Sequence, residues 1–285
     1  NSLINVQLLR VKLSNGKITR EKIDIELVKK YLGGRGLATK ILLNEINPNI
    51  DALAPENKLI FSTGLLTGTT APTGARYMAV TKSPLTGAVA SSNSGGFFGA
   101  ELKKAGHSLI VIEGKSAAPV YLKIHDKNVE IKNAAHLWGK DTGAATDLLA
   151  AEFGETGAKI SCIGPAGEHL VKMASIMNDK HRAAGRSGVG AVMGSKNLKA
   201  IVVKGTGKLE VHDEEKFKRS VKMKNELIRK NSITGEALPA LGTKVLDSII
   251  NAHGMYPANN FQSGTFASIN EVNGEALVNK GYFKK

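Results

Sequence analysis

Two glycine-rich segments that contain arginine are the parts of this sequence best suited to bind a ligand. The first covers residues 63–77 and is followed by a second glycine run at 91–99; the other segment covers 177–190. Small residues let backbone amides approach a ligand closely, and an arginine fork binds the oxygens of an anion in pairs. A helix that begins after Gly95-Gly96 would also direct free N–H groups toward an anion. The pattern predicts a site for a ligand that carries phosphates.

Nucleotide-binding motifs do not explain these segments. The sequence lacks the Gly-x-x-x-x-Gly-Lys-Ser/Thr pattern, which excludes a P-loop. Gly188-Val-Gly-Ala-Val-Met-Gly194 resembles a dinucleotide-binding loop, but residues 179–187 before it are polar and charged instead of forming a buried strand. The strand–turn–helix context is missing, so NAD binding is disfavoured.

Metal-binding and nucleophilic side chains show no useful spacing. Cys162 is the single cysteine, which rules out a disulfide, a cysteine-bound iron–sulfur cluster or a cysteine-type zinc site within this chain. It lies in the apolar run 159–163, which predicts a buried, inert thiol. The seven histidines show no metal spacing. For His181, beside Arg182, a hydrogen-bonding or packing role is favoured over a ligand role.

The formal charge of +14 has three explanations. Lysine and arginine bind nucleic acid through counterion release, a few arginines hold a phosphorylated ligand, or scattered lysines simply solvate the surface. Aromatic residues interleaved with basic ones are missing, which disfavours nucleic acid. No apolar stretch reaches the length of a membrane span and the first residues are not signal-like, so we expect a cytoplasmic protein with no membrane partner.

Hydrophobic periodicity predicts a chain rich in short strands. Residues 4–25 alternate around Asn15-Gly16, which is typical of a hairpin. A helix is expected over 25–44, broken at 33–36, and others over 141–153, 214–230 and 242–253. The remaining strands are expected at 58–63, 77–81, 109–113, 120–124, 129–131, 160–163 and 200–204.

An internal repeat organises these elements. Residues 58–64 resemble 159–164, each a strand that runs into glycine, and residues 99–114 resemble 190–205. We therefore expect an α+β fold: a β-rich domain of two duplicated halves about a pseudo-twofold axis, with helices packed on the sheets. The glycine loops of both halves would meet at one face. The predicted domains are residues 1–208 and a short helical segment, 209–285.

Over nearly its whole length the sequence resembles the amino-terminal part of the aldehyde:ferredoxin oxidoreductase family. The resemblance is carried by long motifs in the same order: Tyr31-Leu-Gly-Gly-Arg-Gly-Leu-Ala38, Pro72-Thr-Gly-Ala-Arg-Tyr77, Thr81-Lys-Ser-Pro-Leu-Thr-Gly87, Asn93-Ser-Gly-Gly-Phe-Phe-Gly-Ala-Glu-Leu102, Ile163-Gly-Pro-Ala-Gly-Glu168, the run 177–200, Gly242-Thr243 and Asn259-Asn-Phe-Gln262.

The resemblance implies a base of two related β-rich halves that carries a tungsten, or molybdenum, bis-pterin cofactor (tungstopterin). A magnesium ion would bridge the two pterin phosphates, and the protein would supply no tungsten ligand and no catalytic residue from this region. Matched motif by motif, the cofactor-binding residues are Arg76, Asn93, Gly95, Arg182, Ala183, Gly185 and Arg186. Asn93 and the Ala183 carbonyl would serve the magnesium, which prefers oxygen ligands.

The resemblance also implies parts that this chain does not contain. In the family a cysteine-bound 4Fe-4S cluster, the acid–base groups and the substrate channel lie farther along, so the full-length protein would oxidise a small aldehyde and pass electrons to ferredoxin, and it could form a homodimer. We expect residues 209–285 to be the truncated start of a helical second domain and this chain to be inactive alone. The alternatives are a non-catalytic pterin-binding or carrier module, and a relative acting on another substrate such as an aromatic thioester.

Overall fold

The computed structural model describes residues 6–283. It divides the chain into two compact units, Asn1–His212 and Asp213–Lys285. The sequence places the boundary at 208/209, in the same irregular segment between a strand that ends at Lys204 and a helix that begins at Glu214. Each unit is described by itself below.

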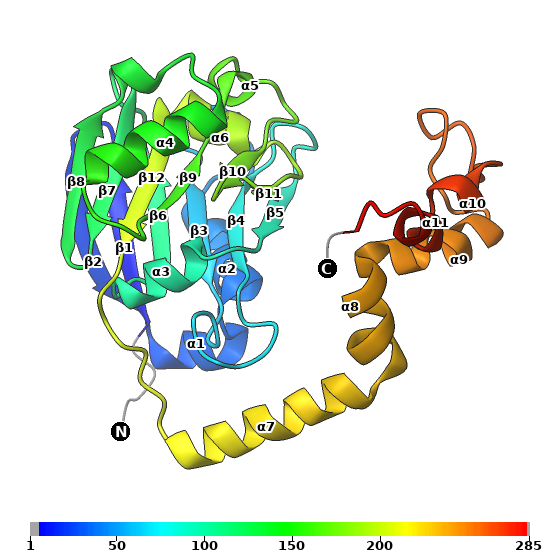
Figure 1. Cartoon of the computed structure of the whole chain (residues 1–285). Coiled ribbons are helices and arrows are strands. Elements are labelled where there is room, and N and C mark those ends of the chain that lie inside the picture. Colours follow the sequence, from blue (N-terminus) through cyan, green and yellow to red (C-terminus); the bar gives the residue numbers. More distant parts are fainter. Residues whose placement is uncertain (1–5, 284–285) are drawn as a thin grey trace. The chain divides into compact units, whose positions relative to one another are not determined.

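The first half of unit 1 forms a six-stranded sheet, sheet A, with the order β2-β1-β6-β3-β4-β5 (Figure 1). Strands β1 and β6 run parallel, and the other neighbours are antiparallel. The predicted hairpin is confirmed, because Lys12 pairs with Lys17 across a turn in which Gly16 has φ 71°. The strands are β1 (Gln7–Lys12), β2 (Lys17–Lys22), β3 (Leu59–Thr63), β4 (Tyr77–Lys82), β5 (Val89–Ser94) and β6 (Leu109–Glu113).

The second half repeats this topology in sheet B, whose order is β11-β10-β9-β12-β7-β8. A hairpin again lies at one edge, its first strand is again parallel to the last strand of the half, and the remaining neighbours are antiparallel. The predicted duplication is therefore confirmed strand by strand. The strands are β7 (Val120–His125), β8 (Asn128–Asn133), β9 (Lys159–Cys162), β10 (Ile176–Asn178), β11 (Arg182–Ala184) and β12 (Leu198–Lys204).

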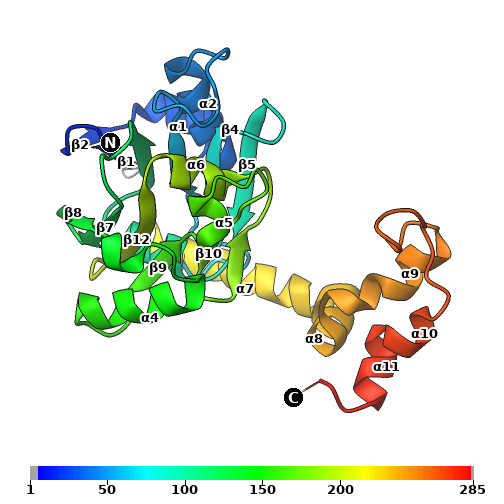
Figure 2. The same ribbon diagram turned by 90° about the horizontal axis from the view of Figure 1, so that it is seen from above.

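Helices fill the layers around the two sheets (Figures 1 and 2). Alternate strand residues of both sheets share one central core with α3 and α6, whereas the opposite face of sheet A packs on α1 and α2, and that of sheet B on α4. The predicted helix over 25–44 is interrupted at Leu32-Gly33. The helices are α1 (Ile25–Tyr31), α2 (Gly34–Glu45), α3 (Phe98–Lys104), η1 (Ala135–Leu137), α4 (Thr142–Phe153), α5 (Pro165–Glu168) and α6 (Val189–Ser195).

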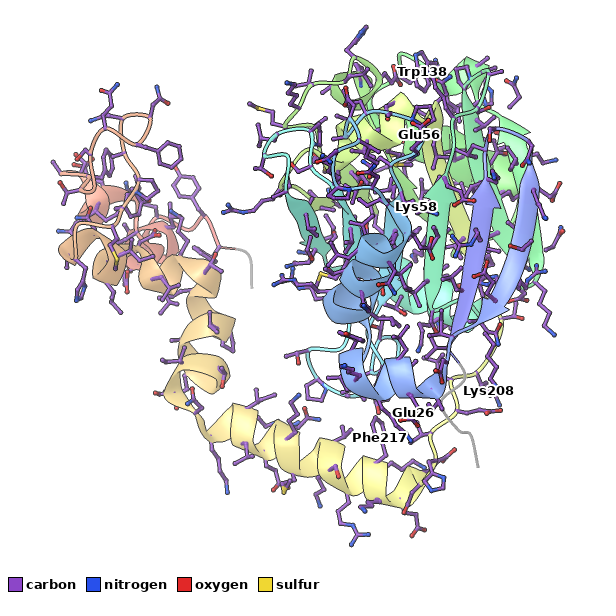
Figure 3. The ribbon with its side chains drawn as sticks, turned by 180° about the vertical axis from the view of Figure 1, so that it is seen from behind. Glu26, Glu56, Lys58, Trp138, Lys208 and Phe217 are labelled. Carbon is purple, nitrogen blue, oxygen red and sulfur yellow. The ribbon has the colours of Figure 1, made fainter. Side chains whose placement is uncertain are left out.

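Unit 2 is helical and has few buried side chains. Its longest helix, α7, is amphipathic, and Phe217 on it is only partly buried (Figure 3). Ile269, Asn273 and Gly274 are its buried residues among those described. No helix within residues 6–283 has both the length and the apolar character that crossing a membrane requires. The elements are α7 (Glu214–Lys230), η2 (Ser232–Ala237), α8 (Leu238–Leu241), η3 (Gly242–Leu246), α9 (Asp247–Ala252), α10 (Ile269–Val272) and α11 (Gly274–Asn279).

A buried lysine joins the two halves of unit 1. Lys196, in the second half, is fully buried and donates to the carbonyls of three first-half residues: Pro55 and Gly114, both at 3.2 Å, and Asn57. Burial lowers the pKa of Lys196 to about 8, so the ammonium stays protonated at neutral pH and all three acceptors remain satisfied.

Replacement of Lys196 by methionine tests this contact. Lys196→Met keeps the aliphatic stem but removes a buried ammonium that donates to three carbonyls, so we expect the free energy of unfolding to fall by about 3–5 kcal/mol. Urea unfolding followed by circular dichroism measures it. The matched variant Lys218→Met, on an exposed lysine of α7, should change stability by less than about 0.5 kcal/mol. Equal effects in both variants would contradict the assignment.

Candidate functional site

The two sheets meet along their edge strands. β5 is the last strand of sheet A and β11 the last strand of sheet B, and the two strands contact each other (Figure 1). β5 follows one of the predicted ligand-binding segments and β11 lies inside the other. The fold therefore brings both segments to one place, as the duplication predicts.

The hydrogen-bond registers relate Asn93 of the first half to Ala183 of the second. Leu109 and Ala200 are matching positions of the sequence repeat. In sheet A the cross-strand partners lead through Leu109, Ser62, Met78 and Asn93. In sheet B the same path leads through Ala200, Cys162, Met177 and Ala183. The two residues that the family resemblance assigns to magnesium thus occupy equivalent positions of the duplicated halves.

Each edge strand ends one residue before a glycine that the fold itself does not require. Gly95 follows β5 and Gly185 follows β11, so this pair is related in the same way as Asn93 and Ala183. Neither glycine has a positive φ. A Cβ on Gly95 would meet no atom within 4 Å, and one on Gly185 only the Ala183 Cβ at 3.9 Å. Gly95 and Gly185, the wall glycines, therefore border open space without a side chain, which suits the close approach of a ligand.

Three predicted arginines converge on β5 or the turn that follows it. Arg76 Nη1 donates to Asn93 Oδ1 at 2.6 Å, and the backbone N–H of Arg186 donates to Ser92 Oγ at 3.1 Å. Arg182 lies beside Gly96, since its Cγ is 3.2 Å from the position that a Cβ there would take. The structure therefore places Arg76 and the 182–186 turn at the same edge of unit 1, not on opposite sides.

A fourth arginine, Arg35, was not among the predicted site residues. It lies in the first turn of α2, and its Nε donates to Ser91 Oγ on β5 at 3.0 Å. The available signal was its place in the motif Tyr31-Leu-Gly-Gly-Arg, which marks the break between two helices. Arg35, Arg76, Arg182 and Arg186 are all exposed. Within the described part of the chain, none of the four makes an ion pair with a carboxylate, so four guanidinium groups without such a partner lie at this edge.

A buried hydrogen-bond network under the site holds the edge strands together. Asn178 accepts through Oδ1 from Ser94 Oγ at 2.6 Å and from the Tyr77 hydroxyl at 3.2 Å, and its Nδ2 donates to the Gly95 carbonyl at 3.0 Å. These bonds cross from the second half to the first. Burial raises the pKa of Tyr77, so the phenol stays protonated and acts as a donor. The network therefore positions Gly95 and its neighbours against β11.

The turn that carries Arg182 is held in a strained shape. Asp179, Lys180 and Ser187 all have positive φ angles, of 51°, 62° and 67°. Asp179 Oδ2 accepts from the Phe97 N–H at the start of α3, at 3.1 Å, and Lys180 pairs with Asp147 of α4 at 2.6 Å. These contacts fix the turn from both halves.

The site offers a cation only oxygen ligands. Residues 6–283 contain no group of three or more histidine, cysteine or acidic side chains that could hold a metal ion. The Asn93 amide oxygen and the Ala183 carbonyl are the two oxygens that the family resemblance assigns to a cation. Such a set suits Mg²⁺. Cys162 is buried, and burial raises the pKa of its thiol, as expected for an inert residue.

Family models and related proteins identify the family of this chain. Residues 8–205 match the model described as aldehyde ferredoxin oxidoreductase, N-terminal domain, and residues 219–285 match the model for domains 2 and 3. The chain belongs to the aldehyde ferredoxin oxidoreductase family. A tungsten-containing aldehyde ferredoxin oxidoreductase of Pyrococcus abyssi is 54% identical over 274 residues, which cover 96% of this chain and 45% of that protein. The chain thus spans less than half the length of this relative.

Two proteins with other names are also similar to this chain. The WOR-like subunit of an aliphatic sulfonate oxidoreductase of Pyrococcus furiosus is 40% identical over 230 residues, 75% of this chain and 36% of that protein. The solved active-site complex BamBC of benzoyl coenzyme A reductase, with 1,5-dienoyl-CoA, superposes with a TM-score of 0.79 and 39% identity. That match covers 83% of this chain and 36% of the other.

Removal of the Asn178 side chain tests the network. Asn178→Ala leaves the buried hydroxyls of Ser94 and Tyr77 and the Gly95 carbonyl with fewer partners, so we expect the free energy of unfolding to fall by about 2–4 kcal/mol. Asn128→Ala, at an exposed asparagine that donates to Glu130, should stay within about 0.5 kcal/mol of the parent chain. Denaturant titration compares the two, and a neutral Asn178→Ala would refute the role of the network.

Substitution of the wall glycines tests whether the fold needs them. Gly95→Ala and Gly185→Ala should leave the free energy of unfolding unchanged or raise it by up to about 1 kcal/mol, because φ and packing both permit a methyl group. Gly194→Ala should destabilise by about 1–3 kcal/mol or more, since its Cβ would overlap the Gly167 carbonyl. Thermal unfolding of the three variants measures this, and equal losses would show that the wall glycines are structural.

Proposed function

We propose that unit 1, which includes the predicted domain 1–208, binds a tungsten or molybdenum bis-pterin cofactor. The chain would be the cofactor-binding portion of an oxidoreductase that oxidises aldehydes to carboxylic acids and passes electrons to ferredoxin. The observation that carries the proposal is the equivalence of Asn93 and Gly95 with Ala183 and Gly185 at the junction of β5 and β11. A pair of equivalent positions suits a ligand made of two identical pterins.

Different residues would bind different parts of the cofactor. Arg76, Arg182 and Arg186 would bind the pterin phosphates, which a guanidinium fork matches in geometry and charge. Gly95 and Gly185 would let the cofactor lie against the backbone. Asn93 Oδ1, which has a second lone pair beside the one that accepts from Arg76, and the Ala183 carbonyl would hold a bridging Mg²⁺.

The bound cofactor would supply the two-electron chemistry, and unit 1 contributes binding and orientation. Residues 209–285 would begin the helical second domain. The 4Fe-4S cluster, the aldehyde pocket and the ferredoxin surface would belong to the full-length protein. The match to this chain covers 45% of the P. abyssi enzyme, which illustrates how much longer such a protein is.

The second candidate keeps the cofactor and changes the substrate. Proteins named for an aliphatic sulfonate and for benzoyl coenzyme A are similar to this chain at 40% and 39% identity, which supports this second candidate. The higher identity of 54% to the aldehyde enzyme favours an aldehyde. Rates of dye reduction by the full-length protein with an aldehyde, a sulfonate and an aromatic thioester distinguish the candidates.

Metal analysis of the full-length protein tests cofactor binding. In Arg76→Gln and Arg182→Gln we expect the molar ratio of tungsten plus molybdenum to protein to fall at least about tenfold, because each change removes a charge-assisted phosphate contact. Inductively coupled plasma mass spectrometry measures it. Arg219→Gln, on the exposed surface of α7, should keep the parent ratio. Retention of the metal in both site variants would refute the proposal.

A further inference from the structure

The segment that leads out of unit 1 is held against the unit over residues 205–209, which we call the strap. Domain boundaries commonly fall in exposed, flexible segments that few contacts cross. Here the chain leaves β12 at Lys204 and contacts α3, the turn between β7 and β8, and the connection from β3 to β4 before α7 begins at Glu214. Lys208 lies within the strap (Figure 3). These contacts indicate an ordered segment.

The end of α3 holds the first part of the strap. The Gly205 N–H donates at 3.1 Å to Oε1 of Glu101, a side chain of α3 that is almost fully buried. The Gly207 N–H donates to the Lys104 carbonyl at 3.2 Å. The two backbones lie so close that a Cβ on Gly205 would overlap the Ala105 nitrogen, and a Cβ on Gly207 would lie 2.6 Å from the carbonyl oxygen that its own N–H contacts. Both positions therefore require glycine.

The turn between β7 and β8 holds the middle of the strap. Asp126 accepts from the Thr206 N–H at 2.7 Å and from the Thr206 hydroxyl at 2.6 Å, with one carboxylate oxygen for each bond. The Asp126 N–H donates to the Lys204 carbonyl at 3.0 Å. Nε2 of the buried His107, just after α3, lies 3.0 Å from the Asp126 carbonyl oxygen. Asp126 is thus held from both halves and offers two charged acceptors to one strap residue.

The last residue of the strap covers the connection from β3 to β4. A Cβ on Gly68 would come within 2.6 Å of Leu209 Cδ1, and within 3.4 Å of the Ala100 Cα in α3. Gly68 also has a φ of 84°, which favours glycine. Among residues 6–283, no backbone hydrogen bond is formed by residues 210–212. The held part of the segment therefore ends at Leu209.

The strap repeats the way in which the first half ends. Gly114 and Gly205 are matching positions of the sequence repeat, and each follows the last strand of its half. Two residues after Gly114, the Ser116 N–H donates to the Lys196 carbonyl at the end of α6, just as the strap bonds to the end of α3. In the first half this segment leads directly into β7, which is mostly buried. The exit from the second half is therefore built like an internal connection of the fold.

We propose that the strap is a conformational device: it fixes the point at which the chain leaves unit 1, and it holds the connection from β3 to β4 in place. The flexible part of the link to unit 2 then begins only after Leu209. Release of the strap would loosen two regions together, residues 205–209 and residues 64–76, the second of which includes Arg76. Neither consequence depends on which ligand unit 1 binds.

Tryptic cleavage after Lys208 in the 285-residue chain tests the strap. The Lys208 side chain is exposed, but a protease needs a released backbone, so the cleavage rate reports the population of the open strap. Asp126→Ala removes both acceptors of Thr206 and should raise the rate at least about tenfold. Glu26→Ala, at an exposed carboxylate of α1, should stay within about twofold of the parent chain. Mass spectrometry identifies the cleaved bond.

Hydrogen exchange followed by mass spectrometry tests the hold on the connection from β3 to β4. Leu209→Ala removes the side chain that lies over Gly68, so the amides of residues 64–76 should exchange at least about fivefold faster. Leu148→Ala, at a partly exposed leucine of α4, is the matched control and should leave this segment unchanged. Peptides from β7 should keep the parent rate in both variants.

The strap is wrong if the parent chain is cut after Lys208 as fast as an unfolded peptide of the same sequence, or if Asp126→Ala and Glu26→Ala have equal effects. Unchanged exchange of residues 64–76 in Leu209→Ala would also contradict it. So would equally faster exchange in β7, because that result indicates a general loss of stability. None of these outcomes bears on the proposed function, which the metal content of the arginine variants tests separately.

Discussion

The site depends on the contact between the edge strands of two separate sheets. Edge strands expose unpaired backbone groups, and here β5 and β11 cover each other while the buried Asn178 side chain bonds across them to Ser94, Gly95 and Tyr77. A buried polar group of this kind is costly unless every partner is in place, so the contact has one favoured geometry. That geometry sets the separation of the two glycine turns.

Duplication explains why a pair of equivalent positions exists at all. Each half has the same six-strand order, so the same ladder position recurs once in each sheet. Asn93 and Ala183 share that position although one offers a side-chain amide and the other only a backbone carbonyl. Both halves therefore have an oxygen available at this ladder position, although the type of residue differs between them.

Divergence is larger outside the strands. The first half uses an open connection between β3 and β4 and leaves a cavity lined by Arg35 and Arg76, whereas the second half uses α5 packed on α6. The charged groups differ in the same way. The arginines at the site have no carboxylate partner in the described residues, whereas Lys196 and Lys199 are buried and hydrogen-bonded, the latter to Glu168 and the Lys140 carbonyl.

Periodicity alone determined most elements of unit 1, including the hairpin at Gly16, the strand over 109–113 and the duplication, because buried alternation and glycine turns are local signals. The glycine and arginine types marked the site segments, and the family motifs named seven of its residues. The strands β5, β10 and β11 were not predicted, since a polar sequence such as Val-Ala-Ser-Ser-Asn-Ser becomes a strand only through its neighbour in the sheet. Only the tertiary structure could decide that Arg35 reaches β5, that Asn178 bonds across the halves, and that Gly95 and Gly185 face open space. Each of these features depends on residues far apart in the chain, and no local sequence pattern predicts it.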